Sequence, residues 1–375
     1  MTAPSSATAW LTRDAFSSAG PSIGPSIGPG ADRGLLLVSP DADVVVPLDE
    51  ADRTAALDIA AATLSAAGIT GDDRVVVALN NDGELTGALI ARAAAEVAAA
   101  AAAVGPRGRM RLHHALETLR ATTLIVTPTG AMDFLARLHL EFLIDPLDLE
   151  LGRILLVGEI ASPGCDAQLA AEFEAEVWEL YADPFFGLPI AHRAPGDAVL
   201  TPVRASLLEV AAPDKDAALD PPYPSGLAEL VVTPTWHASL GGVTLRTGQA
   251  ARIEGGGDGI PSPAHTVGEH VLIRGRWVSI QKVAAALAGI DGITHWELRI
   301  SRAGTLDAAA VHVTFGRDTL VTNPMWRSRI VQALTAITPV TIDVVVEEQA
   351  SAEARPWSVT DLRGHHLGRD RTQLT

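Results

Sequence analysis

Residues 74–79 read RVVVAL and residues 123–127 read TLIVT, two short apolar runs rich in β-branched residues. Such runs are typical of buried strands. The pattern continues on both sides of this pair, with helices predicted over residues 49–67, 84–103, 112–120, 131–138 and 166–173, and further strands over residues 34–38, 44–46, 153–157 and 176–180. Because strands that alternate with helices form parallel βαβ units, the sequence predicts a parallel α/β layer.

The composition of the chain changes after residue 195, where Pro/Gly-rich segments with short strands run to residue 259. This pattern predicts a β-rich subdomain on the α/β layer. From residue 271 the predicted order is β-α-β-β-α-β, which is typical of a small two-layer domain. We therefore expect four parts: an N-terminal segment with a Gly/Pro linker (1–33), an α/β domain with its β-rich subdomain (34–267), a small C-terminal domain (268–350) and a polar tail (351–375).

The formal net charge is −17, which predicts a surface that repels nucleic acid and anionic lipid. Small molecules or proteins are the expected partners. Cys165 is the only cysteine, which excludes an internal disulfide. The alanine-rich run at residues 87–104 contains Arg92 and Glu96 and falls short of a membrane span. Because the N-terminus also lacks the pattern of a signal peptide, we expect a cytoplasmic protein.

Several short strings of the chain carry a resemblance to a known family. They are WLTRDAF (10–16), LIVTP (124–128), Gly158 with Glu159, Tyr181 with Pro189 and Ala191, ELVV (229–232), RTG (246–248) and IRG (273–275). In order and spacing they resemble the phenylacetate-CoA ligases, which belong to the adenylate-forming, AMP-binding superfamily of acyl-CoA synthetases. The resemblance implies the adenylate-forming enzyme fold, with a large N-terminal α/β region, a β-rich subdomain and a small C-terminal α+β domain.

The resemblance also implies a nucleotide site. In the family, a Ser/Thr/Gly loop wraps the ATP phosphates, a tyrosine stacks on adenine and an aspartate holds the ribose. By position, the resemblance assigns cofactor binding to Ser39, Gly158, Glu159, Tyr181, Ala182, Arg246 and Gln249. The ligands it implies are AMP, ATP or CoA, together with a small carboxylic acid or acyl compound. It assigns no metal site and no catalytic residue here.

The chain departs from the family's motifs at positions that handle charge. Residues 38–44 read VSPDADV, an acidic loop with a proline, which is a poor phosphate cradle. Phe185 stands where the family has the glutamate that holds magnesium, and Gln249 stands in place of the ribose-binding aspartate. The family's hinge string is replaced by HTVGE (265–269), which keeps an acid and lacks the arginine.

The family also carries a lysine near its C-terminus that contacts the reacting groups. Here the only lysines are Lys215 and Lys282, and the tail offers Arg363, Arg369 and Arg371 instead. A forked guanidinium on a different stem does not simply replace an ammonium group. Because the loss of one contact to a developing charge costs about 100–1000-fold in rate, we expect weak ATP binding and inefficient adenylation.

Three function classes remain open. The first is a degenerate ligase-like protein that keeps an acyl, aryl or nucleotide pocket and serves a biosynthetic pathway as a binding protein or remodelled enzyme. A resemblance to shortened ligase-like proteins of antibiotic pathways, such as phenazine biosynthesis, favours it. The second is an active ATP-dependent acyl- or aryl-CoA ligase with displaced catalytic residues. The third is a regulatory or scaffold subunit with a protein partner.

Other candidate residues have simpler interpretations. The histidine pair at 113–114 is typical of a helix surface, and the pair at 365–366 is predicted to lie in a disordered tail. Cys165 follows a Ser-Pro-Gly turn, but nothing near it in the sequence supplies a base. Tyr181 can stack on a ligand or pack against the phenylalanines at 185 and 186, and the sequence leaves both interpretations open.

Overall fold

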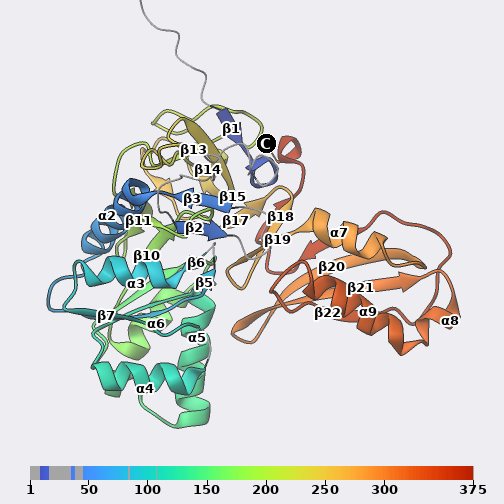
Figure 1. Ribbon diagram of the computed structural model, residues 1–375, viewed down its shortest axis with the longest axis horizontal. Coiled ribbons are helices and arrows are strands. Elements are labelled where there is room, and N and C mark those ends of the chain that lie inside the picture. The colour runs from blue at the N-terminus through green and yellow to red at the C-terminus, as the bar shows by residue number, and fades with distance from the viewer. Residues whose placement is uncertain (1–8, 17–34, 39–44, 83–84, 107, 375) are drawn as a thin grey trace, which may run out of the picture. The chain divides into compact units, whose positions relative to one another are not determined.

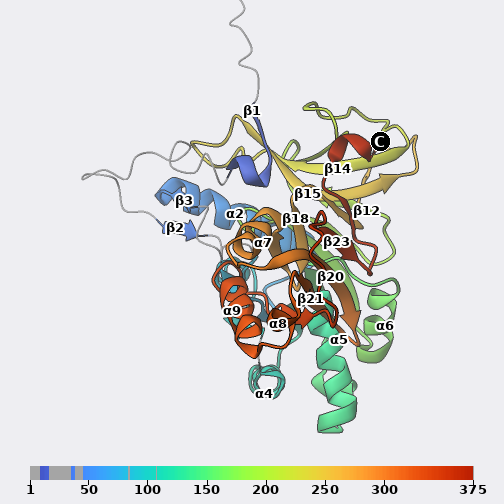
Figure 2. The ribbon, with the colours of Figure 1, turned by 90° about the vertical axis from the view of Figure 1, so that its right-hand side faces the viewer.

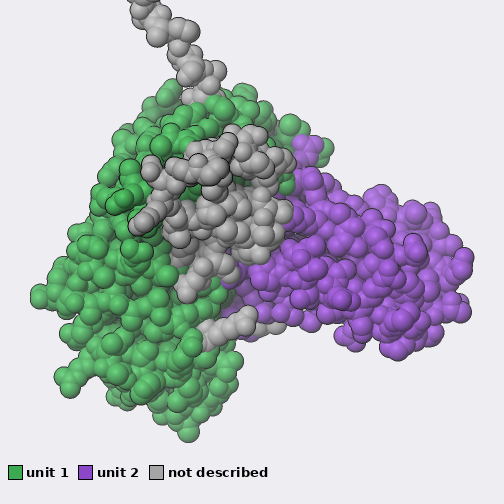
Figure 3. Space-filling model, in the orientation of Figure 1, with its two compact units in different colours: residues 1–264, 371–375 green, residues 265–370 purple. Residues whose placement is uncertain are grey.

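The computed structural model describes residues 9–16, 35–38, 45–82, 85–106 and 108–374 of the chain (Figure 1). The chain divides into two compact units (Figure 3). Unit 1 comprises residues 1–264 with 371–375, and unit 2 comprises residues 265–370. The last residues of the chain therefore belong to the same unit as residues 1–264.

Unit 1 is built on an eight-stranded sheet with the order β16-β12-β11-β10-β9-β8-β4-β7. Its strands are β4 (Arg74–Ala78), β7 (Ala100–Ala103), β8 (Thr123–Val126), β9 (Arg153–Val157), β10 (Glu176–Ala182), β11 (Pro189–Arg193), β12 (Val199–Pro202) and β16 (Ile260–Pro261). Neighbouring strands from β7 to β10 are parallel, whereas β11, β12 and β16 are added antiparallel. The parallel half confirms the predicted βαβ alternation.

Helices cover both faces of this sheet. They are α2 (Glu50–Ala66) and α3 (Gly87–Ala95) on one face, and α4 (Arg109–Leu119), α5 (Pro128–Arg137) and α6 (Cys165–Phe173) on the other. Along β4, Val75 and Val77 pack with the first group, while Val76 and Ala78 pack with the second. This burial on both faces explains why residues 75–79, which include most of β4, are apolar without interruption. A π-helical turn η1 (Leu138–Phe142) and a 3-10 turn η2 (Pro146–Leu149) connect α5 to β9.

The single helix predicted over residues 84–103 is wrong in its second half. A short hairpin of β5 (Asn81–Asp82) and β6 (Leu85–Thr86) precedes α3, and α3 ends at Ala95. The alanines of β7 then pair in parallel with β4, which makes β7 an edge strand of the sheet. Alanine favours a helix by itself, but the backbone hydrogen bonds offered by β4 override this weak preference.

The β-rich part of unit 1 contains β13 (Leu208–Ala211), β14 (Gly226–Val232) and β15 (Val243–Ile253), which pair antiparallel in that order. Strand β1 (Ala9–Leu11) runs parallel to β15. A separate hairpin is formed by β2 (Leu35–Val38) and β3 (Val45–Leu48). The Pro/Gly-rich region therefore forms strands, as its sequence predicts.

Unit 2 contains a four-stranded sheet in the order β22-β21-β20-β23. Its elements are β17 (His265–Val267), the hairpin β18 (His270–Ile273) and β19 (Arg276–Ser279), α7 (Ile280–Ala288), β20 (Ile293–Ala303), β21 (Leu306–Phe315), α8 (Asp318–Val321), α9 (Pro324–Thr335), β22 (Asp343–Val346), β23 (Ser358–Asp361) and β24 (His366–Gly368). Helices α7 and α9 lie on the same side of this sheet (Figure 2) and share one apolar core with it.

The segment predicted to be a polar tail has regular structure. Strand β23 pairs with β20, β24 pairs with β17, and a 3-10 turn η3 (Arg371–Gln373) follows. The histidines at 365 and 366 are partly buried there, and burial lowers the pKa of each to about 4. The prediction of disorder at this pair is wrong because long-range strand pairing orders the segment. No helix in the described ranges is long and apolar enough to cross a membrane.

Candidate functional site

A cavity of about 330 Å³ lies in unit 1 at the carboxyl ends of β8, β9 and β10. Pro128 follows β8, Gly158 follows β9, and Tyr181 and Ala182 end β10. The carboxyl ends of parallel strands are where loops and helix N-termini converge, which is where open α/β sheets bind their ligands. The volume falls at the lower end of the range of about 300–1000 Å³ that is common for small-molecule sites.

The cavity brings together most of the residues that the family resemblance assigns to cofactor binding. Gly158, Glu159, Tyr181, Ala182 and Gln249 all line it. They come from the turn after β9, from the end of β10 and from β15, so their convergence is a property of the fold. Two assigned residues are absent from this group: Arg246 lies elsewhere in unit 1, and Ser39 falls outside the described residues.

Tyr181 is only 4% exposed and is one of the residues that line the cavity. Its hydroxyl is buried near the Thr247 hydroxyl but makes no hydrogen bond of ordinary length in the described part of the chain. Burial raises the pKa of Tyr181 far above its ordinary value, the nearby Thr247 hydroxyl opposes this shift, and the charges of Asp183 and Glu229 add to it. The phenol therefore stays protonated and neutral, as a group that can donate or accept one hydrogen bond.

Gln249 lies on β15 and is 7% exposed. Gly248 has a φ of 76°, and its backbone N–H donates to Glu229. The Gln249 backbone N–H donates to the Thr247 hydroxyl at 3.0 Å, which fixes the main chain. Its side-chain Oε1, however, is buried without a partner among the described residues. Buried polar atoms without partners are uncommon in folded proteins, and two of them beside one cavity indicate a place for a ligand.

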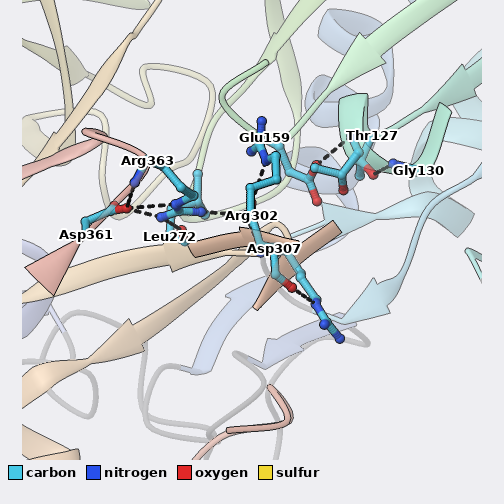
Figure 4. Close-up of polar contacts among 10 residues, drawn as sticks. Thr127, Gly130, Glu159, Leu272, Arg302, Asp307, Asp361 and Arg363 are labelled. Atoms are coloured by element: carbon cyan, nitrogen blue, oxygen red, sulfur yellow. Dashed lines mark hydrogen bonds and ion pairs between the residues drawn. The ribbon is translucent and has the colours of Figure 1, made fainter. Parts of the chain in front are cut away.

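Glu159 follows a glycine turn at the end of β9, where Gly158 has a φ of 85° that other residues rarely adopt. Its Oε2 accepts a hydrogen bond of 3.0 Å from the backbone N–H of Thr129, in the first turn of α5 (Figure 4). Thr127 caps the same helix by accepting from the N–H of Gly130 at 3.1 Å. The N-terminus of α5 is thus occupied by groups of the protein itself.

Arg246 does not line the cavity, because its guanidinium is held in a separate polar cluster. Nη1 donates to Glu229 at 2.7 Å, and Nε donates to Asp216 at 3.0 Å. The carbonyls of Ala212 and Lys215 accept from Nη2, and the Trp10 ring lies 5.2 Å below the guanidinium carbon. In this structure Arg246 therefore pairs with groups of the β-rich region, and its assignment to cofactor binding stays a prediction.

The three tail arginines that stand in for the family's lysine all bind carboxylates of the protein. Arg371 donates to Glu229 at 3.1 and 3.2 Å, and Arg369 donates to Glu269 at 2.7 Å. Arg363, whose side chain is only 4% exposed, donates to Asp361 and Asp307 and to the Leu272 carbonyl (Figure 4). The arrangement indicates structural roles for these arginines.

Two acidic residues, Glu179 and Asp183, add charged groups to the site and its surroundings. In the cavity wall, Glu179 accepts from Arg193 at 2.8 and 2.9 Å and from the Ser262 hydroxyl at 2.8 Å. Just beyond Tyr181, Asp183 is completely buried, and its Oδ1 accepts from the Phe185 N–H at 2.8 Å. Burial raises the pKa of Asp183 to about 7, against the opposing effects of the Phe185 N–H and the charge of Arg13.

No metal centre is visible in the parts of the chain that the structure describes: they contain no group of three or more His, Cys, Asp or Glu side chains placed to hold an ion. Asp183 accepts from the Phe185 N–H with one oxygen, and its other oxygen is buried. The site described here therefore consists of a cavity with hydrogen-bonding groups and charged pairs.

The structure of 2-hydroxyisobutyryl-CoA ligase in complex with 2-HIB-AMP and CoA superposes on this chain with a TM-score of 0.79, covering 94% of this chain and 80% of that one at 16% identity. This chain has the adenylate-forming enzyme fold. Amide bond synthetase McbA from Marinactinospora thermotolerans also matches, with a TM-score of 0.62, 17% identity and coverage of 87% of this chain and 68% of that one.

A third match is o-succinylbenzoate-CoA synthetase from Bacillus subtilis bound to a product analogue, with a TM-score of 0.60, 13% identity and coverage of 84% and 65%. No protein-family model and no curated protein matches the sequence. At these identities the matches establish the fold of an acyl-CoA ligase or amide synthetase. The residues of this chain must carry any argument about its activity.

Proposed function

We propose that this chain is a degenerate, phenylacetate-CoA ligase-like protein of secondary metabolism, which binds a small planar ligand but does not adenylate acids efficiently with ATP. The observation that carries the proposal is the cavity at the ends of β9 and β10, with Tyr181 and Gln249 in its wall. Each residue has a buried polar atom without a partner, so a bound acyl, aryl or nucleoside-like ligand has hydrogen bonds to complete.

The second half of the proposal rests on the cations of the chain. Adenylation places negative charge on phosphate and carboxylate oxygens, and enzymes stabilise it with fixed positive groups. Arg363, Arg369 and Arg371 each bind a carboxylate, and no lysine follows Lys282. The chain therefore lacks a tail lysine and commits its three replacement candidates to internal ion pairs.

ATP-pyrophosphate exchange with a panel of aryl and acyl acids tests this proposal. We expect no exchange above background. Calorimetry should give an ATP dissociation constant in the high micromolar range or weaker, which corresponds to a binding free energy on the order of −5 to −6 kcal/mol. Rapid exchange with any acid would instead support the second candidate, an active acyl- or aryl-CoA ligase, which the fold of the matching ligases favours. Co-purification with a ligase or carrier protein would favour a regulatory subunit.

The two tyrosines of the chain give a matched test of the pocket. Tyr181 and Tyr223 are both buried in unit 1, but only Tyr181 lines the cavity. We expect both Tyr181→Ala and Tyr223→Ala to lower the melting temperature, because both remove a buried ring. Only Tyr181→Ala should also weaken binding of a planar ligand, by about 1–3 kcal/mol, as for aromatic platforms that stack bases. Equal affinity in both variants would show that Tyr181 serves packing alone.

A further inference from the structure

The charges in the cavity wall follow a pattern that bears on the kind of ligand it accepts. Three features of the wall could attract an anion: the N-terminus of α5, the N-terminus of α6 and the guanidinium of Arg193. Helix N-termini present unpaired N–H groups and partial positive charge, and arginine binds carboxylate or phosphate with a fork of donors. In a nucleotide site these would be the groups available to phosphate oxygens.

Each of these features already holds a carboxylate of the cavity wall. Glu159 accepts from the Thr129 N–H at 3.0 Å in the first turn of α5. Asp166 lies in the first turn of α6 and accepts from the Ala167 N–H at 2.9 Å. Glu179 accepts from Arg193, the one basic side chain among the described residues that line the cavity.

Among the described residues that line the cavity, Glu159, Asp166 and Glu179 are the acidic side chains, and each contacts one of the three features. A ligand phosphate or carboxylate would have to displace one of them or lie beside it unpaired. Either outcome costs free energy, since a charge without a partner is penalised when it leaves water. Among the described residues that line the cavity, the buried side-chain atoms without partners are both uncharged: the Tyr181 hydroxyl and the Gln249 Oε1.

We infer that the cavity selects an uncharged planar ligand that offers at least one hydrogen-bond donor, and that it discriminates against phosphorylated or carboxylate forms of the same ring. The donor is required because Oε1 of an amide can only accept. This inference rests on the proposed function, since it takes the cavity to be a ligand site. It differs from the expectation for an ATP-using ligase, whose ligand carries phosphates.

Calorimetry with two matched pairs of probes tests the inference on the full chain. Adenosine and AMP share one ring system and differ by a phosphate, while benzamide and benzoate differ by an amide and a carboxylate. We expect the neutral member of at least one pair to bind, and its charged counterpart to bind at least about tenfold more weakly, the effect of one unmade charge-assisted contact. Equal or tighter binding of the anion overturns the inference and leaves the proposed pocket intact.

If no probe of either pair binds, the proposed function itself fails, and the inference fails with it. A charge variant adds an independent test. Glu179→Gln keeps the size of the side chain and removes the charge that neutralises Arg193, so AMP or benzoate should gain about tenfold in affinity while the neutral probe changes less than about threefold. An unchanged preference in this variant overturns the inference.

Glu141→Gln is the matched control. Glu141 of η1 also pairs with an arginine, Arg137 at the end of α5, at 2.8 Å, but this pair is exposed and does not line the cavity. This variant makes the same change in net charge as Glu179→Gln, so it should leave the affinities for all four probes unchanged. A gain in anion binding with the control would show that net charge, and not the cavity wall, sets the preference, which contradicts the inference.

Discussion

Replacing Asp183 with asparagine is expected to stabilise unit 1 by about 4 kcal/mol at pH 8 and to change its stability little at pH 3. The carboxyl group is completely buried, and burial raises its pKa from the ordinary 3.8 to about 7. A difference of about 3 pKa units between the folded and unfolded states corresponds to about 4 kcal/mol. Urea unfolding of both proteins at pH 3, 5 and 8 gives the comparison.

The direction of the effect follows from proton binding. Between pH 3.8 and about 7 the folded state keeps a proton on Asp183 that the unfolded state has released, so the stability of the wild type falls as the pH rises through this interval. Asparagine keeps the acceptor for the Phe185 N–H and cannot ionise, so its variant should lack this decline. The positive charge of Arg13 lowers the pKa of Asp183 and so reduces the free-energy cost of ionising the buried carboxyl.

The exposed Asp58 of α2 provides the control for this experiment. Asp58→Asn should change the free energy of unfolding by less than about 0.5 kcal/mol at each pH, as is usual for surface substitutions. If Asp183→Asn also left the free energy of unfolding unchanged at pH 8, the buried carboxyl would be ionised at no cost in stability. A partner for its second oxygen would then have to be present.

The fold could be predicted from the sequence because its signals are local and repeated. The run at residues 74–79 is apolar on both faces, which marks a strand buried between two layers of helices. The same logic places Gly158 and Tyr181 close together, since they end neighbouring parallel strands. The alanines of β7 carry no such signal, because alanine fits a helix or an edge strand and only pairing with β4 decides between them.

The charge pairs could not be predicted in the same way. Arg371 binds Glu229, 142 positions earlier, and Arg369 binds Glu269, 100 positions earlier. No periodicity connects such residues, so the sequence shows the arginines of the tail but not their partners. Arg246 illustrates the same limit. The sequence shows its Arg-Thr-Gly motif, but not that its side chain donates to Glu229 and Asp216 and does not line the cavity.

Arg363→Met is expected to destabilise unit 2 by about 3–5 kcal/mol at pH 7, because it leaves the carboxylates of Asp307 and Asp361 buried without their cation. Nη1 of Arg363 lies 2.5 Å from Asp307, and Nη2 lies 2.8 Å from Asp361. Burial raises the pKa of Asp361, but the hydrogen bonds and charge of Arg363 outweigh it and hold that pKa below 3.8. Arg302 also donates to Asp307 at 2.8 Å, so Asp307 keeps one cation in the variant and only Asp361 loses its arginine completely.

The destabilisation should depend on pH. A carboxyl with a lowered pKa contributes stability above its unfolded value of 3.8 and loses it as the pH falls through the folded value, so the gap between wild type and Arg363→Met should narrow below pH 3.8. The control is Arg355→Met, since the Arg355 side chain is 62% exposed and lies 3.9 Å from Glu353. Such a pair contributes less than about 1 kcal/mol. An Arg363→Met protein as stable as the control, but with altered ligand binding or exchange, would show that Arg363 has a functional role in place of the structural one.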